Sequence, residues 1–162
     1  MSWTALAVIL LCLVLLVRRA SKGPALTPES LEWPIRGLLR QGYNGGYLII
    51  DVTRSKKFLR LDKYIRAPGD YGIELAFPKA EWSFAYYHRL LDFCTSRGIG
   101  YRISASVPGD PMEYLFIDFG NDHVRANAIV REVLLIVLDV PQNHPVYFKL
   151  ENATPEDRLI DS

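Results

Sequence analysis

This sequence is poor in the residues that build disulfide scaffolds and metal sites. It contains two cysteines and three histidines among its 162 residues. Cys12 lies in an apolar run and Cys94 in a predicted helix, so the two cannot frame a disulfide scaffold. The histidines also lack a spacing that would supply a complete set of metal ligands. We therefore expect neither a disulfide framework nor a metal site.

Complete catalytic motifs are missing as well. Asp118-Phe119-Gly120 matches the magnesium-binding tripeptide of protein kinases, but the glycine-rich loop, strand lysine and catalytic-loop aspartate that kinases need are absent. Gly98 and Gly100 follow a predicted helix instead of a strand, which argues against a dinucleotide-binding loop. The sequence predicts neither an enzyme nor a bound cofactor.

The alternative is an enzyme whose site is assembled by the fold from dispersed residues. The candidates for such a site are His88, Asp92, Asp118 and Asp122. His88 and Asp92 stand four residues apart on a predicted helix and therefore share a face. The apolar positions of that helix lie on another side, which favours a solvent-exposed pair over an acid–base site.

No charged side chain occurs in the first seventeen residues, and Arg18, Arg19 and Lys22 follow directly. This pattern predicts a single-pass transmembrane anchor over residues 1–20. By the positive-inside rule, the N-terminus lies outside and the following domain is cytoplasmic. A cleaved signal peptide is one alternative, although the sequence lacks a basic region before the run and a clear cleavage site after it. A helix packed inside a soluble complex is the other.

The remainder of the chain has the length of one domain. Pro24, Pro28 and Gly23 indicate a linker over residues 21–30, before a domain over 31–153 and a polar tail over 154–162. Runs of β-branched and aromatic residues between turn signals predict strands. These strands cover residues 47–53, 58–65, 71–77, 101–107, 113–119 and 146–150.

Three helices are predicted from apolar residues that recur every three or four positions. They cover a short segment ending at Leu39, residues 81–96, and a long segment ending at Leu138. Gly98 is expected to cap the C-terminus of the second, and Asn121 or Asp122 the N-terminus of the third. The run of the third helix from Ile129 to Leu138 is interrupted only by Arg131 and Glu132, which makes it more apolar than a helix with one exposed face usually is.

This order of elements predicts an α+β fold. After the anchor and the first helix it is βββ-α-ββ-α-β, with a mainly antiparallel sheet and helices packed on one face. From Tyr71 onward the order matches the ferredoxin-like arrangement. Up to Leu138 it resembles that of small secretion-chaperone-like domains, which implies binding of a partner polypeptide.

The net charge of +1 conceals two halves of opposite sign. Residues 1–66 contain 11 Lys and Arg against 4 Asp and Glu, whereas residues 67–162 contain 8 against 14. The densest basic segment supplies the candidate contact residues for a membrane surface or a partner: Arg54, Lys56, Lys57, Arg60, Lys63 and Arg66. An anionic leaflet would attract them, whereas the simpler reading is a polar strand edge that resists edge pairing. The acidic remainder argues against nucleic acid as a partner.

Together these patterns favour a membrane-anchored interaction or adaptor module, of which a chaperone-like protein and an accessory subunit are the two candidate kinds. The expected partners are lipid, through the N-terminal helix, and a protein or a second copy of the chain. The sheet or the apolar helix from Val124 to Leu138 is the expected protein contact, because buried interfaces need apolar surface.

Overall fold

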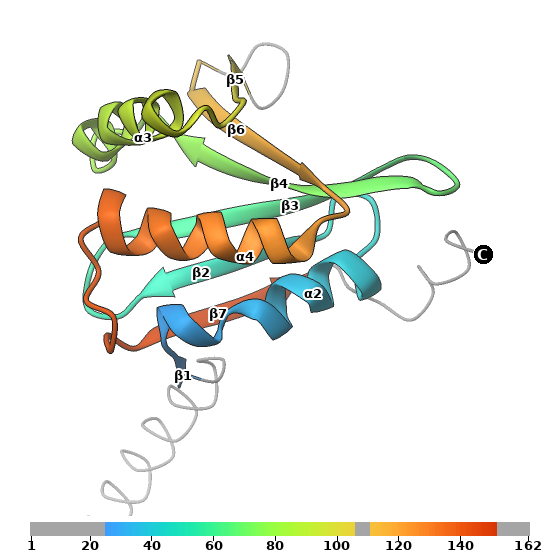
Figure 1. The fold of residues 1–162 in the computed structure, drawn as a ribbon, viewed down its shortest axis with the longest axis horizontal. Helices are drawn as coiled ribbons and strands as arrows, with labels where there is room; N and C mark the ends of the chain where they lie inside the picture. The colour runs from blue at the N-terminus through green and yellow to red at the C-terminus, as the bar shows by residue number, and fades with distance from the viewer. Residues whose placement is uncertain (1–24, 106–110, 152–162) are drawn as a thin grey trace, which may run out of the picture.

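An antiparallel sheet and three helices make up residues 25–105 and 111–151, which the computed structural model describes (Figure 1). The mixed α+β class is therefore confirmed. The predicted anchor, 1–20, and the predicted tail, 154–162, lie outside the described residues. None of the helices within the described stretches combines the length and the apolar character that a membrane crossing needs.

The sheet consists of six strands of four residues or more and one strand of two residues. In chain order these are β1 (Ala25–Leu26), β2 (Tyr47–Val52), β3 (Phe58–Ala67), β4 (Asp70–Pro78), β5 (Arg102–Ala105), β6 (Glu113–Gly120) and β7 (Val146–Glu151). Their order across the sheet is β1-β7-β2-β3-β4-β6-β5, and all neighbours are antiparallel. The predicted meander of β2, β3 and β4 and the predicted hairpin of β5 and β6 are both confirmed.

The helices begin and end close to the predicted positions. They are α2 (Glu32–Gln41), α3 (Phe84–Arg97) and α4 (His123–Glu132), with a short 3-10 helix, η1 (Pro28–Ser30), before α2. Asp122 caps α4 by accepting a hydrogen bond from the backbone N–H of Arg125 at 2.9 Å. Gly98 ends α3 in the left-handed region at φ 63°. The sequence did not predict that α4 continues as a π-helical turn, η2 (Val133–Val137).

The ferredoxin-like expectation holds for only part of the sheet. β4 and β5 flank β6, as in a split βαβ unit. The last strand, β7, pairs with β2 instead of β4, so the β2–β3 hairpin lies between β4 and β7. Element order alone does not decide which edge a final strand joins.

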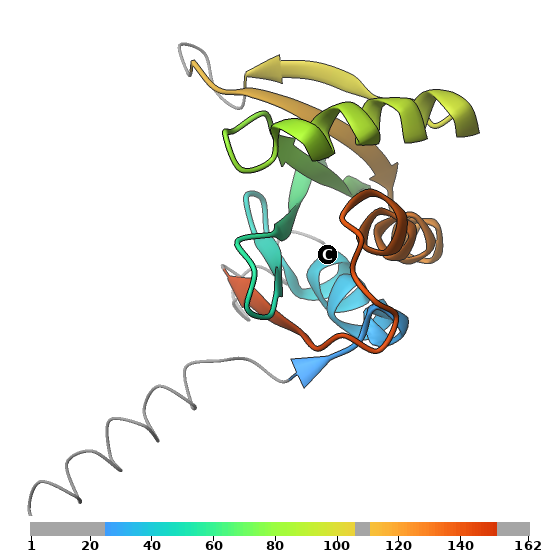
Figure 2. The ribbon, with the colours of Figure 1, turned by 90° about the vertical axis from the view of Figure 1, so that its left-hand side faces the viewer.

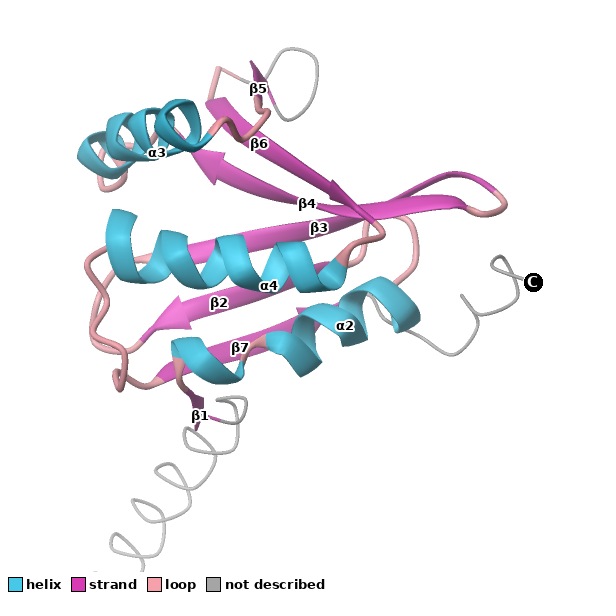
Figure 3. Ribbon diagram, viewed as in Figure 1, coloured by secondary structure: helices cyan, strands magenta, loops and turns pink. Residues whose placement is uncertain are grey.

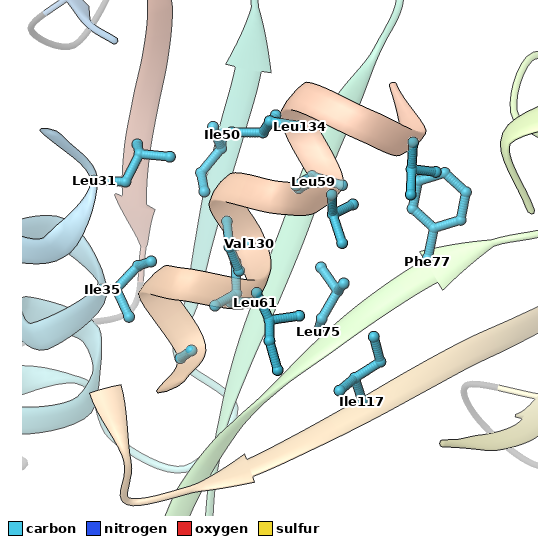
Figure 4. Packing of buried hydrophobic residues seen from close by; sticks show 14 of the residues in the cluster. Leu31, Ile35, Ile50, Leu59, Leu61, Leu75, Phe77, Ile117, Val130 and Leu134 are labelled. Atoms are coloured by element: carbon cyan, nitrogen blue, oxygen red, sulfur yellow. The ribbon is translucent and has the colours of Figure 1, made fainter. Parts of the chain in front are cut away.

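The core lies between the helices and one face of the sheet (Figure 3). Alternate residues of the central strands point toward the helices, for example Leu59 and Leu61 of β3. Figure 4 shows these two side chains with Leu75 of β4 close to Val130 and Leu134 of α4 and η2. All five are fully buried.

The long apolar helix is explained by its position within the core. α4 and η2 lie on the sheet, with contacts to α2 and to α3 (Figure 2). Most of their apolar side chains are buried there: Ala126, Ile129, Val130, Val133, Leu134 and Val137. Val124 and Ile136 remain exposed. The surplus of apolar residues between Val124 and Leu138 is thus used mainly inside the domain, and it no longer argues for a partner on this helix.

The first strand of the described residues lies within the segment that the sequence predicts as a linker. Ala25 pairs with Tyr147 and Leu26 with Val146, so β1 extends the sheet beyond β7. The first residues of the fold and its last strand therefore share one edge of the sheet.

Candidate functional site

The face of the sheet turned away from the helices carries a regular set of arginines, carboxylates and aromatic rings. On β3, Arg60, Asp62, Tyr64 and Arg66 alternate with residues that point into the core. The register places Asp62 beside Glu74 of β4, and Glu74 beside Asp118 of β6. A row of three carboxylates therefore crosses the centre of this helix-free face.

The first arginine unit is centred on Arg60. Its guanidinium forms an ion pair with Asp62 at 2.8 Å and lies over the Tyr47 ring of β2, 4.5 Å from the ring centroid. Burial raises the pKa of Asp62, while the hydrogen bond and charge of Arg60 act in the opposite direction. The contact with the ring and the ion pair together fix the orientation of the guanidinium.

The second unit is centred on Arg102 of the edge strand β5. Its Nη2 donates to both carboxylate oxygens of Glu74, at 3.0 and 2.9 Å, and its guanidinium lies 3.7 Å from the centroid of the Phe116 ring. Its Nη1 also donates to the Ser104 hydroxyl at 2.8 Å. Burial raises the pKa of Glu74, with Arg102 opposing the shift. This unit ties β5 to β4 across β6.

The third unit joins Arg66, Tyr64 and Asp118. The Tyr64 hydroxyl donates to Asp118 at 2.7 Å, and Arg66 lies over the Tyr64 ring with its Nη2 3.7 Å from the same carboxylate. Burial and the bond to Asp118 raise the pKa of Tyr64 to about 12, so the phenol stays protonated at neutral pH. Asp118 also accepts from the Gly120 N–H at 2.8 Å. The Asp118 carboxylate is therefore occupied by hydrogen bonds within the fold. The Asp118-Phe119-Gly120 tripeptide thus has a structural role that needs no kinase chemistry.

The fold distributes the six residues of the predicted basic segment over three locations. Arg60 and Arg66 lie on the helix-free face, as described above. Arg54 and Lys56 are exposed in the turn between β2 and β3, where Arg54 adopts a left-handed backbone at φ 59°. Thr53 ties this turn to the segment before β7 through its hydroxyl, which donates to the Pro145 carbonyl at 2.6 Å.

The other two, Lys57 and Lys63, are directed toward the helices. The Lys57 ammonium donates to the Leu138 carbonyl at 2.6 Å and lies 4.6 Å from the centroid of the Tyr86 ring. Lys63 is only 1% exposed, and its ammonium lies 5.0 Å from the centroid of the Tyr71 ring. Of the six, Arg54 and Lys56 are exposed and have no partner among the described residues.

The four residues of the alternative enzyme site lie on separate parts of the fold. His88 is exposed on α3 and contacts the Phe84 ring, with centroids 4.8 Å apart, and Asp92 is exposed one turn later. Asp118 belongs to the helix-free face, and Asp122 is the cap of α4. Within the described residues, no hydrogen bond or ion pair joins any two of the four. Residues 25–105 and 111–151 also contain no cluster of three or more His, Cys, Asp or Glu suited to a metal ion.

Cys94 is fully buried on α3. Burial raises the pKa of its thiol to about 11, so the thiolate needed for nucleophilic chemistry is scarce at neutral pH. Its position is that of a core side chain.

The sequence pointed to the sheet as one possible protein contact, but it did not single out the arginines, carboxylates and rings of the helix-free face. Its signal was present in β3, where Arg, Asp, Tyr and Arg recur at every second position from 60 to 66. The six cations of the basic segment do not form one surface, because successive residues of a strand point to opposite faces of the sheet.

No family model, no curated protein sequence and no solved structure matches this chain. The function is therefore argued from the residues and their geometry alone.

Proposed function

We propose that the protein is a membrane-tethered interaction module whose helix-free sheet face binds a protein partner at the cytoplasmic side of a bilayer. The observation that carries the proposal is the set of three arginines, Arg60, Arg66 and Arg102, each paired with a carboxylate and stacked on an aromatic ring. Arginine and aromatic side chains are the groups enriched at the centres of protein interfaces.

The arginines suit this role because they are held in place before a partner arrives. Their side chains are 46%, 60% and 54% exposed, so each guanidinium keeps free donors toward solvent. An immobilised side chain loses less conformational entropy on binding, which leaves more of the contact energy as affinity. The alternating acids make a strongly anionic partner such as nucleic acid unsuitable.

The tether rests on the uncharged leader and the positive charges that follow it. Ala25, the start of β1, lies only six positions after Arg19, and an extended chain of this length spans at most about 20 Å. A domain on so short a connection stays close to the headgroups. Arg54 and Lys56 lie in the turn after β2, two strands across from β1, and would then meet an anionic leaflet.

Site-specific photocrosslinking in native membranes tests the protein contact. A photoreactive phenylalanine derivative at Ile49, between Lys149 and Arg60 on the helix-free face, should give a discrete adduct. The same group at Phe84, which is 53% exposed on α3, is the matched control and should give none. Arg60→Gln with Arg102→Gln should abolish the Ile49 adduct. Equal adducts at the two positions, or an Ile49 adduct that survives the double substitution, would contradict the proposal.

Topology is tested separately. Alkaline extraction should leave the full chain in the membrane pellet, and a C-terminal reporter should be active on the cytoplasmic side. A mature chain that starts near Ser21 would remove the tether. The enzyme alternative, with His88, Asp92, Asp118 and Asp122, gains no supporting observation, since those side chains are not brought together.

A further inference from the structure

Most cationic side chains in the described part of the chain have a partner within the fold. Those of Arg36, Arg40, Arg54 and Lys56 have none among the described residues, whereas the others form ion pairs, hydrogen bonds or ring contacts. Neighbouring cations without a partner among the described residues can bind an external anion. The positions of these four are therefore informative.

Two of these four cations lie on α2 and the other two in the turn between β2 and β3. Tyr147 of β7 pairs with Ala25 and is followed by Phe148. The Phe148 ring contacts the Trp33 ring of α2, with the two centroids 4.6 Å apart. Arg36 and Arg40 follow Trp33 at helical spacing, so all three share one side of α2. Arg54 and Lys56 follow Val52 of β2. Val52 pairs with Val146 of β7, and Leu26 of β1 pairs with Val146 from the opposite side.

The exposed side of α2 is also hollowed. A shallow pocket of about 440 Å³ lies between α2 and β7, and its lining includes Trp33, Arg36, Gly37, Arg40 and Leu150. Gly37 leaves its floor open, because no atom lies within 4 Å of the position that a Cβ would take. Trp33 is 48% exposed beside it, and Glu32, one turn before Arg36, forms no ion pair with that arginine.

We propose that Trp33, Arg36 and Arg40 form a seat for the headgroups of anionic phospholipids, an inference that rests on the membrane tether of the proposed function. Arginine donates its N–H groups to phosphate in a fork that suits the two oxygens. Tryptophan favours the boundary between headgroups and acyl chains, where its ring is buried and its N–H stays hydrated. The apolar floor near Gly37 and Leu150 suits the glycerol and upper acyl carbons.

The location of the tether strengthens the choice of lipid. Because Trp33 contacts the residue next to the partner of Ala25, the seat lies beside the point where the chain leaves the sheet toward residues 1–24. With about 20 Å of connecting chain at most, the seat remains within reach of the headgroup layer. The tether thus supplies a high local concentration of lipid to a site that would be weak in solution.

Quenching of Trp33 by brominated lipid tests the seat in the full-length protein. The chain is reconstituted into vesicles of phosphatidylcholine alone or with phosphatidylserine, with bromine on the upper acyl carbons. The difference in fluorescence between the wild type and Trp33→Phe isolates the emission of Trp33. The difference between the wild type and Trp3→Phe isolates the emission of Trp3 and reports whether the predicted anchor is in the bilayer. Trp33 should be quenched more strongly when phosphatidylserine is present.

Charge substitutions complete the test. Arg36→Gln with Arg40→Gln should lower the ratio of docked to undocked Trp33 about 30-fold, since each cation near an anionic leaflet contributes about 1 kcal/mol and about 1.4 kcal/mol corresponds to tenfold. Arg36→Lys with Arg40→Lys should retain much of the quenching. Ala85→Glu with Thr95→Glu, two exposed positions on α3, makes the same change in net charge and should have no effect.

Three results would overturn the seat. Trp33 that is unquenched with phosphatidylserine, although Trp3 is quenched, would refute the seat and leave the tether intact. An equal loss in the α3 control would show a general charge effect. A Trp33 signal that changes on removal of residues 152–162, and not with lipid composition, would assign the pocket to that acidic segment. If Trp3 itself is not quenched, the tether fails, and with it the proposed function.

Discussion

Two neighbouring lysines in the turn after β2 are expected to have different roles, although the sequence gives no reason to separate them. Lys57 donates to the Leu138 carbonyl at the end of η2 and contacts the Tyr86 ring. Lys56 is exposed and has no partner among the described residues. We therefore expect Lys57→Ala to destabilise the fold and Lys56→Ala to leave its stability unchanged.

The magnitude follows from the contacts of the Lys57 ammonium. A hydrogen bond to a charged group contributes about 1.5–3 kcal/mol, and the ring contact about 0.5–1 kcal/mol. Releasing the side chain returns up to about 1.5–2 kcal/mol of rotamer entropy. The substitution should lower the free energy of unfolding by about 1–2 kcal/mol, whereas Lys56→Ala should stay within about 0.5 kcal/mol of the wild type.

Urea unfolding of the full chain in mild detergent measures this difference. Trp82 is a suitable probe because its ring contacts Phe58 and Phe77, at 5.0 and 5.9 Å between centroids. With a slope of about 2 kcal/mol per molar urea, the midpoint of Lys57→Ala should fall by about 0.5–1 M. Equal midpoints for the two variants, or a lower midpoint for Lys56→Ala, would refute the assignment of Lys57 as the cap of η2.

Two further predictions concern the sheet and its acids. Gly72→Ala should lower the free energy of unfolding by at least about 1–3 kcal/mol, because the added Cβ would lie 2.7 Å from the Gly120 carbonyl. Gly37→Ala in α2 should raise the free energy of unfolding by about 0.5–1 kcal/mol, because alanine favours a helix over glycine. Calorimetry of the two variants measures both changes. Burial raises the pKa of Asp62 and Glu74, so the stability linked to their protonation is fully present below the unfolded-state values and is lost as pH rises through the raised folded values. Relative to Asp62→Asn with Glu74→Gln, the wild type should therefore gain free energy of unfolding as pH falls from about 7 to about 4, and a difference independent of pH would contradict this.

Local signals in the sequence predicted the elements well, because each is set by a few adjacent residues. Gly98 and Asp122 cap their helices as expected, and β5 and β6 pair as the predicted hairpin. These features depend on backbone conformation and hydrogen bonds within a few positions.

Features that depend on segments far apart in the sequence could not be predicted from such local signals. The pairing of β7 with β2 depends on which edge stays open after the hairpin folds, and no residue of β7 encodes that alone. The burial of Lys63 and the engagement of Lys57 arise because the strand alternation turns their side chains toward the helices. The arginine units on the opposite face combine residues of the five strands from β2 to β6, so they are recognisable only once these strands are aligned.

The pairing of the last strand with β2 has a consequence for synthesis. Until β7 emerges from the ribosome, one edge of β2 has no neighbour, and the short β1 has no strand to join. Unpaired edges of this kind invite association with other chains. The sheet can therefore be completed only after β7 has emerged, and until then the open edge of β2 is exposed to mispairing with other chains.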